Sequence, residues 1–436
     1  MINLASYRNK LARIETLKLV GKVRQAGGLV IESEGPPAGM GELCEIRSQQ
    51  GGRPILAEVI GFRGKTVLSM PVYEIGGVKL GDPIIARKQL PSVEIGDALL
   101  GRVIDGNGRP IDGKRLMAPG RSYPLHRQAP SPLERRPIDT PLGTGVRAID
   151  GLLSVGRGQR VGIFGGSGVG KSTLLGMMAR YTEAEVSVIA LVGERGREVK
   201  SFIERDLGEE GLKHSVVVVS TSDHPPLMRI RAALTATAVA EYFRDRGKDV
   251  LLVMDSVTRV AMAQREIGLA AGEPPASKGY TPSVFTLLPR IFERAGNMEQ
   301  GSITGFYTVL VEGDDMNEPV ADAVRGLLDG HIVLSREMAW KNHFPAISAL
   351  ESVSRLMPDI SGQDHREMAG RIRELLATYR KAEDMINIGA YARGSNPKID
   401  QAIDRIDHIN LFLQQKSEDK VPRETAVQEL MRLLKK

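Results

Sequence analysis

The stretch of residues 161–181 constrains the fold of this chain more than any other. Residues 161–164 form an apolar run that indicates a buried strand, residues 165–172 read GGSGVGKS, and residues 173–181 have helical character. The middle part matches the G-x-x-x-x-G-K-[ST] pattern, in which backbone amides and a helix N-terminus surround phosphate groups. Because strand, loop, Lys-Ser pair and helix occur in this order, we expect a phosphate site and not a turn that merely connects a strand to a helix.

The phosphate loop gives chemical roles to two of its side chains. Lys171 is expected to reach the β- and γ-phosphates of a nucleoside triphosphate, and the Ser172 hydroxyl to ligate Mg²⁺. A further acid, Asp255, follows the apolar run 250–254. The pattern at Asp255 alone favours a cap of a strand-to-helix turn. The phosphate loop upstream favours a Mg²⁺ ligand at the carboxyl end of a buried strand.

Glu194 follows another apolar run, residues 186–192. If that strand lies next to the strand of the phosphate loop, the Glu194 carboxylate stands beside the γ-phosphate and can orient and polarise an attacking water. The alternative is an exposed acidic residue that opens a helix, where negative charge is favourable. The residues themselves leave these two interpretations evenly balanced.

Hydrophobic patterning divides the chain into three parts and predicts an α/β protein. Near-continuous apolar runs separated by helical segments predict a largely parallel sheet covered on both faces. These runs are 160–164, 186–192, 215–219, 250–254, 303–310 and 331–334. Short β-rich runs with Gly-rich turns predict a small N-terminal barrel or sandwich. They are 17–23, 29–32, 42–46, 55–62 and 66–70.

The remaining segments complete this division. Prolines cluster in 120–141, which predicts an extended connector, and 367–387 and 397–415 carry apolar residues at helical spacing. We therefore predict three domains. Their boundaries are 1–92, 93–362 and 363–436.

Composition narrows the classes of protein further. The single cysteine, Cys44, cannot form an intrachain disulfide, and the seven histidines show no zinc-binding spacing. We expect neither a bilayer-spanning helix nor a signal peptide, and hence a protein of the cytosol. The net charge of +6 is mild, and aromatic residues make up only 4%. That content argues against an RNA-stacking surface and therefore against a nucleic-acid partner.

These motifs resemble a known family. Together with GERGRE at 193–198 and DSVTR at 255–259, the phosphate loop is similar to that of the ATPases of flagellar and virulence type III secretion, relatives of the rotary ATP synthase catalytic subunits. AQREIGLA at 263–270 and GDDMNEP at 313–319 are typical of the secretion branch. INIGAY at 386–391 is more similar to the flagellar branch. The similarity extends over nearly the whole chain and includes GPP at 35–37 and GELC at 41–44.

The resemblance implies a fold and a set of site residues. The fold would be a small N-terminal β-barrel, a RecA-like P-loop ATPase core with a mostly parallel sheet, and a C-terminal helical domain. Glu194 would be the catalytic carboxylate, Arg195 would lie near the phosphates, and Asp255 would serve the Mg²⁺ site with Ser172. The nucleotide would be bound by Gly166, Ser167, Gly168, Val169, Gly170, Lys171, Ser172, Thr173 and Phe344.

Two of these roles compete with simpler ones. Arg355, in the segment SVSR, matches the family's arginine finger, which a neighbouring subunit supplies to stabilise charge on the γ-phosphate. Without the resemblance, a surface salt bridge is the preferred role for this residue. Phe344 matches a position at which relatives usually place a tyrosine that stacks on adenine. Packing in the core is its alternative role.

The resemblance also implies the function and the partners. The chain would hydrolyse ATP with Mg²⁺ as a ring, a homohexamer, that energises flagellar type III export. Alternatives are an injectisome ATPase and a non-catalytic nucleotide-binding ring subunit, against which Glu194 argues. A nucleic-acid translocase is a further rival, disfavoured by the low aromatic content.

Several partners follow from the same comparison. They are a central-stalk protein, the export gate, export substrates or chaperones, and a stator-like regulator at the N-terminus. The expected location is the cytoplasm, peripheral to the cytoplasmic membrane. The basic amphipathic segment 4–14 fits a regulator or a membrane face, but also a helix that packs on the chain's own barrel. The loop 272–283 would face the centre of the ring.

Overall fold

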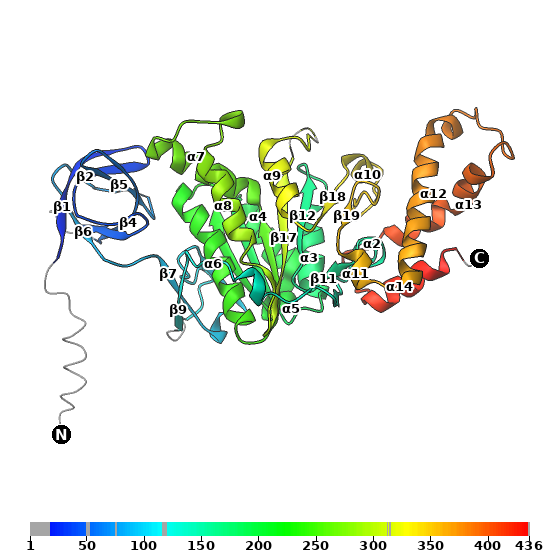
Figure 1. Cartoon of the computed structure of the whole chain (residues 1–436), viewed down its shortest axis with the longest axis horizontal. Helices are drawn as coiled ribbons and strands as arrows, with labels where there is room; N and C mark the ends of the chain where they lie inside the picture. The colour runs from blue at the N-terminus through cyan, green and yellow to red at the C-terminus, as the bar shows by residue number, and fades with distance from the viewer. Residues whose placement is uncertain are drawn as a thin grey trace, which may run out of the picture.

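The computed structural model describes residues 18–48, 53–74, 76–115, 120–311, 313 and 315–434. They form three parts in a row, with a barrel at one end, a sheet flanked by helices in the middle and a group of helices at the other end (Figure 1). The predicted fold class is confirmed, whereas the exact domain boundaries remain predictions. The amphipathic segment 4–14 lies outside the described residues. None of the helices in the described ranges is long and apolar enough to cross a membrane.

The N-terminal part is a closed six-stranded barrel and not a sandwich. Its strands follow the order β1-β2-β5-β4-β3-β6, and β6 pairs with β1 to close the ring. Val23, Ile31, Cys44 and Ile84 are buried in its interior. The five predicted runs correspond to five strands, and the sixth, β6, which begins with proline, was missed. The strands are β1 (Val20–Gly27), β2 (Val30–Glu34), β3 (Leu43–Ile46), β4 (Ile55–Arg63), β5 (Thr66–Pro71) and β6 (Pro83–Ala86).

The central part is built on a sheet of nine strands in the described residues, eight of them in the order β19-β18-β12-β17-β15-β13-β14-β8. Successive strands from β18 to β8 are parallel, whereas β19 pairs antiparallel with β18. All six predicted strands are present. They are β12 (Arg160–Gly165), β13 (Val186–Glu194), β14 (Ser215–Thr221), β15 (Asp249–Asp255), β17 (Ser302–Leu310) and β18 (Gly330–Val333). The remaining strands are β8 (Arg102–Asp105), β16 (Gly296–Asn297), which pairs with β17, and β19 (Val353–Ser354).

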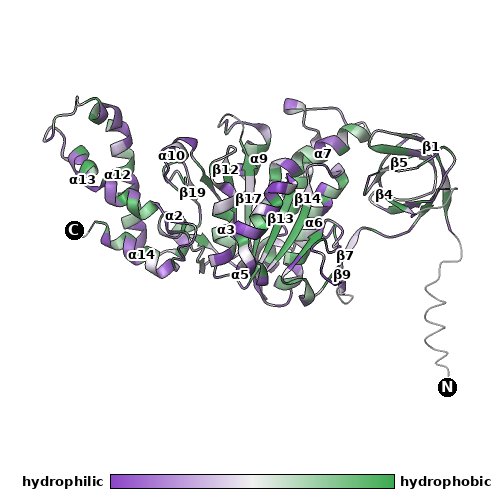
Figure 2. Ribbon diagram, turned by 180° about the vertical axis from the view of Figure 1, so that it is seen from behind, coloured by the Kyte–Doolittle hydropathy of each residue, from purple (hydrophilic) through white to green (hydrophobic). Residues whose placement is uncertain are grey.

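Helices cover both faces of this sheet because its strands are apolar on both sides, as their colour in Figure 2 shows. One face packs against α6 (Pro226–Arg244), α7 (Val257–Ala271), α8 (Pro282–Phe292) and α9 (Pro319–Leu327). The other face packs against α2 (Arg147–Leu152), α3 (Lys171–Tyr181) and α4 (Gly196–Ser201). A π-helix (Phe202–Leu207) and α5 (Gly208–Lys213) continue α4 towards β14.

The proline-rich stretch is more structured than a simple connector. It contains β9 (Arg121–Pro124), paired with β7 (Ser92–Ile95), and β10 (Pro141–Leu142), paired with β11 (Val155–Gly156). The loop predicted at 272–283 is largely confirmed. It contains only a short 3-10 turn, Ser277–Gly279, and ends where Pro282 begins α8.

The C-terminal part is helical, as predicted. It consists of α12 (Gln363–Asn387), α13 (Pro397–Leu413) and α14 (Arg423–Arg432), preceded by the short α11 (Met357–Ile360). Buried Ile372, Phe412 and Leu430 join the same apolar cluster as α2 and α3 of the central part. The helical part therefore packs on α2, and the Ser417 carbonyl beyond α13 accepts hydrogen bonds from Arg180 and Tyr181 of α3.

Candidate functional site

The phosphate loop connects β12 to α3 in the predicted order. Gly168 and Gly170 both have φ of +81°, a conformation that glycine adopts without a steric penalty. Gly170 caps α3 without a side-chain hydrogen bond, so the first amides of this 11-residue helix can face an anion. The Val169 side chain is buried in the core and anchors the loop, whereas Ser167, Ser172 and Thr173 are exposed.

Lys171 and Asp255 come together across the sheet edge. Lys171 Nζ lies 2.7 Å from Asp255 Oδ1, and both side chains are nearly buried. Thr308 lies on β17, between β12 and β15. Its hydroxyl donates a hydrogen bond of 2.7 Å to the same carboxylate oxygen of Asp255. Asp255 thus ends a buried strand beside the phosphate loop, as expected. Asp255 does not cap the following helix, which was its alternative role, because the side chain of Ser256 caps α7.

Glu194 joins this pair from the other side. Burial and the negative charge of Asp255 raise the pKa of Glu194 to about 7, and a hydrogen bond with Glu198 acts in the same direction, while Lys171 opposes the shift. Gly193 has φ of +72°, and the register between β13 and β14 shifts between Val192 and Glu194. Such a bulge redirects the next side chain. A carboxylate with this pKa can exchange a proton near neutral pH.

The sequence placed Glu194 beside the γ-phosphate on the condition that its strand lies next to the strand of the phosphate loop, and this condition is not met. Strand β13 is not the neighbour of β12, because β17 and β15 lie between them. Parallel strands nevertheless end at one edge of a sheet, and Leu191 is in register with Asp255 on the adjacent β15. Glu194 therefore meets the phosphate loop through Asp255 and Lys171.

The two arginines lie in different places. Arg195 follows Glu194 at the same edge, but its side chain is 78% exposed and lies 3.6 Å from Glu198 Oε1. Arg355 follows β19, and its amide donates to the Asp329 carbonyl at the start of β18, the end of the sheet opposite the phosphate loop. The Arg355 side chain is exposed and forms no ion pair with any described residue. A salt bridge to another described residue therefore does not account for it.

Phe344 lies against the phosphate loop. Its ring is 3.2 Å from the point where a Cβ on Gly170 would stand, and the side chain is 39% exposed. It is thus not a core residue, which was the alternative role. The Phe344 carbonyl accepts a hydrogen bond of 3.0 Å from the Gln415 amide, beyond the end of α13.

The sequence analysis did not identify three residues that contact this site. Thr308 hydrogen-bonds Asp255, the Arg259 side chain packs on Gly193, and Asp206 hydrogen-bonds Thr173. Of the three residues, only Arg259 belongs to a sequence motif, DSVTR at 255–259. The others come from segments whose place beside the loop depends on the order of the strands.

Comparison with known proteins agrees with this geometry. Residues 145–354 match the ATP synthase alpha/beta family, nucleotide-binding domain, residues 23–88 match the beta-barrel domain of that family, and residues 361–432 match the T3SS EscN ATPase C-terminal domain. A "Flagellum-specific ATP synthase" of Bacillus subtilis (strain 168) is 55% identical over 420 residues, which cover 96% of each chain.

Solved structures extend the similarity to three dimensions. The assembled ATPase EscN from the enteropathogenic E. coli type III secretion system is 46% identical, with a TM-score of 0.90 over 95% of this chain and 99% of that one. EscN in complex with its central stalk EscO gives a TM-score of 0.87 at 45% identity, over 95% and 99% of the two chains. The chain therefore belongs to the ATP synthase alpha/beta family, in the branch of flagellar and type III secretion ATPases.

Proposed function

We propose that this protein hydrolyses ATP with Mg²⁺ in a homo-oligomeric ring, a hexamer, and thereby energises flagellar type III protein export. The observation that supports this most directly is the cluster of Lys171, Asp255 and Glu194 at the end of the phosphate loop. A cation for the phosphates, a metal-binding carboxylate and a proton-accepting carboxylate are the groups that phosphoryl transfer to water requires.

The phosphate loop and Lys171 bind the phosphates. The amides of 166–173 and the N-terminus of α3 face the anion, and the lysine adds a full positive charge. Asp255 and the Ser172 hydroxyl fit Mg²⁺, since this ion prefers oxygen ligands and is commonly held by one or two side chains together with substrate phosphates. Bound there, Mg²⁺ would neutralise charge on the phosphate oxygens.

Glu194 positions and polarises the attacking water. With a pKa near 7, about half of the Glu194 carboxylates are ionised at neutral pH and can accept a proton from water. This carboxylate also argues against the non-catalytic ring subunit. Arg195, at the start of α4, adds positive charge at the same edge of the sheet.

Arg355 completes the site of a neighbouring subunit. It lies at the start of β18, whereas the phosphate loop lies at the end of β12. β12 has six residues, which at about 3.3 Å per residue separate its ends by roughly 17 Å. An arginine side chain does not span that distance along the sheet, so we assign Arg355 to the next subunit of the ring. Phe344, beside Gly170, stacks on the adenine, and its phenyl ring keeps the stacking face of tyrosine.

The flagellar branch and the partners rest on similarity. Identity is 55% with the Bacillus subtilis relative named flagellum-specific and 46% with EscN of an injectisome. By analogy with the EscN–EscO structure, we propose a central stalk as a partner. We also propose an N-terminal regulator, the export gate and exported proteins or their chaperones. The location would be cytoplasmic, at the inner face of the cytoplasmic membrane.

Substitution of Lys171 tests the proposal. Lys171→Ala removes the charge from the phosphates, and hydrolysis of ATP by the purified protein should fall below detection. Lys213→Ala, on the exposed helix α5, is a matched control that should hydrolyse ATP like the parent. In a Bacillus subtilis strain without its flagellum-specific ATP synthase, the parent should restore swimming and Lys171→Ala should not. Hydrolysis by pure Lys171→Ala would refute the site, and failure of the parent to restore swimming would favour the injectisome alternative.

A further inference from the structure

The segment that carries Phe344 is a compact loop, residues 335–347, which we call the Phe344 loop. Its base is closed by a hydrogen bond of 2.8 Å from the Ser335 amide to the Ala346 carbonyl. Inside it, α10 (Arg336–Trp340) is capped by the Ser335 hydroxyl, and the His343 amide bonds back to the Met338 carbonyl at 2.9 Å. The loop is therefore held together by its own hydrogen bonds.

The inner side of the Phe344 loop touches the phosphate loop at two points. The guanidinium of Arg336 covers Gly166, and the ring of Phe344 covers Gly170. The placement of the Phe344 loop thus fixes where the Phe344 ring stands relative to the phosphate loop. On the proposed function, that ring stacks on the adenine.

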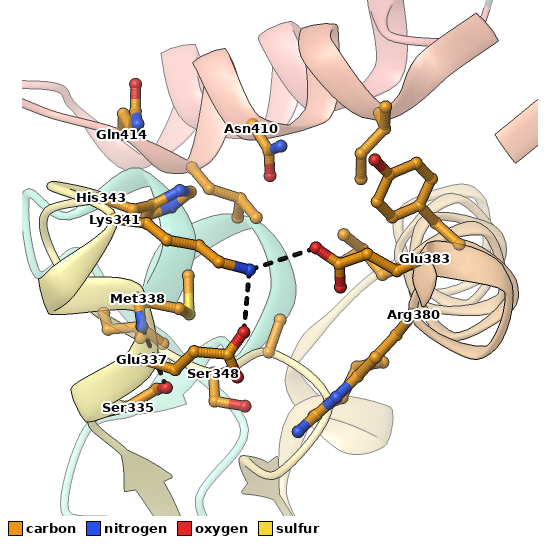
Figure 3. A pocket seen from close by; sticks show the side chains of 17 residues that line it. Ser335, Glu337, Met338, Lys341, His343, Ser348, Arg380, Glu383, Asn410 and Gln414 are labelled. Atoms are coloured by element: carbon orange, nitrogen blue, oxygen red, sulfur yellow. Dashed lines mark hydrogen bonds and ion pairs between the residues drawn. The ribbon is translucent and has the colours of Figure 1, made fainter. Parts of the chain in front are cut away.

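The outer side of the loop faces the helical part across a cavity of about 330 Å³ (Figure 3). Lys341 reaches over this cavity, with its Nζ 2.8 Å from Glu337 Oε1 on the loop and 3.1 Å from Glu383 Oε1 on α12. His343 also lines the cavity. It is 7% exposed, and its Nε2 has no hydrogen-bond partner in the described part of the chain.

A cavity at this place matters because close-packed interiors resist movement. Beside open space, the position of a loop is decided by its few direct contacts. For the outer side of the Phe344 loop these include the Lys341–Glu383 ion pair and the hydrogen bond from the Gln415 amide to Phe344. Arg380, the other cation at the cavity, pairs with Glu351 and not with the loop.

We infer that Lys341 is a positioning residue for the adenine side of the site: through Glu383 it holds the Phe344 loop against the helical part and so sets the affinity for the base. This inference rests on the proposed role of Phe344. It makes the helical part a determinant of nucleotide affinity. Because exposed ion pairs contribute about 0.2–1 kcal/mol, loss of the pair should change affinity by only about 1.4- to fivefold.

Charge reversal gives the sharpest test. Lys341→Glu places three carboxylates together, and Lys341→Glu/Glu383→Lys restores an attractive pair between the loop and α12. The matched control is Lys398→Glu, which breaks an exposed pair with Glu374 between α13 and α12, away from the loop. All variants carry Glu194→Gln to suppress hydrolysis. Calorimetry measures the Kd for Mg-ATP and, as a ligand without a base, for Mg-tripolyphosphate.

We expect Lys341→Glu to weaken ATP binding about 1.4- to fivefold and to leave tripolyphosphate binding unchanged. The double variant should recover, the Lys398→Glu control should bind like the parent, and the defect should shrink at high salt. Equal weakening for both ligands, no recovery in the double variant, or the same defect in Lys398→Glu would overturn the inference.

Trp340 supplies a readout that does not depend on nucleotide. It is the only tryptophan of the chain, lies on the Phe344 loop next to Lys341, and is 78% exposed. Its emission should change in Lys341→Glu and return in the double variant. Identical spectra in all variants would overturn the positioning role. If Phe344→Ala binds ATP normally, the adenine assignment fails instead, and Trp340 emission still decides whether Lys341 holds the loop. Should Lys341→Glu fold poorly, Lys341→Gln removes the same ion pair without adding charge.

Discussion

Arg355→Ala should leave ATP binding intact and abolish catalysis, because we propose that Arg355 serves a different subunit from the one that carries it. Its backbone lies at the amino end of the sheet, roughly 17 Å along β12 from the phosphate loop of its own chain. An arginine finger contributes about 10³- to 10⁵-fold to phosphoryl transfer. We therefore expect kcat to fall by roughly a thousandfold, with little change in the Kd for ATP.

Mixing two inactive variants tests the assignment across the interface. Arg355→Ala retains Glu194, and Glu194→Gln retains Arg355, so an intact site forms wherever the first presents its nucleotide to the arginine of the second. In a head-to-tail ring every interface has the same orientation. With equal amounts and random assembly, about one quarter of interfaces are then intact, and activity should return to about a quarter of the parental value.

The assay is steady-state ATP hydrolysis after co-refolding or subunit exchange, with native mass spectrometry to demonstrate mixed rings. Specific activity of the parent should also rise with protein concentration as rings assemble. If proven mixed rings stay inactive, or if parental activity is constant down to concentrations at which only monomers exist, the role of Arg355 in a neighbouring site is refuted.

Three further predictions concern the chain's own site. Glu194→Gln should bind ATP like the parent but hydrolyse it at least about a hundredfold more slowly; a parental rate in stopped-flow phosphate release would return Glu194 to the role of a helix-opening charge. The parental rate should rise with pH around a midpoint near 7, because burial and Asp255 raise the pKa of Glu194 to about 7 and only its ionised form accepts a proton. A pH-independent kcat between pH 6 and 8 would contradict this. Phe344→Ala should raise the Kd for ATP about tenfold while Phe344→Tyr preserves it, as expected for loss of base stacking measured by calorimetry; equal affinities would show that the ring does not contact adenine.

The sequence predicted where the strands and helices lie along the chain better than it predicted which strands are neighbours in the sheet. The strand–loop–helix order around residues 165–172 and all six apolar strands of the central sheet are confirmed, because a buried parallel strand needs a continuous apolar run. Such runs do not encode the order in which the strands pair. The sequence could therefore only consider β13 as a neighbour of β12, and in the structure the two strands are not adjacent. Strands such as β6, which begins with proline, and β19, which has two residues, were missed.

Site chemistry shows the same division. Lys171 and Asp255 could be chosen from motifs, and the structure brings them within 2.7 Å. The side chains that hydrogen-bond them come from distant segments. Thr308 of β17, which bonds Asp255, is an example that no local pattern identifies. For Arg355 and Phe344, the residues alone favoured or allowed structural roles. The family resemblance supplied the functional interpretation, and their exposed positions are compatible with it.

The short strands at the margins of the central sheet have a consequence for assembly. β19 has two residues and β8 has four, and in the described residues these are the outer strands of the sheet. Edge strands of such length give another copy little backbone to pair with. Neighbouring copies must then meet through side chains and not through a sheet that continues from one to the next. An interface of this kind can tighten and relax without breaking a hydrogen-bonded ladder, which would suit the ring that we propose for this protein.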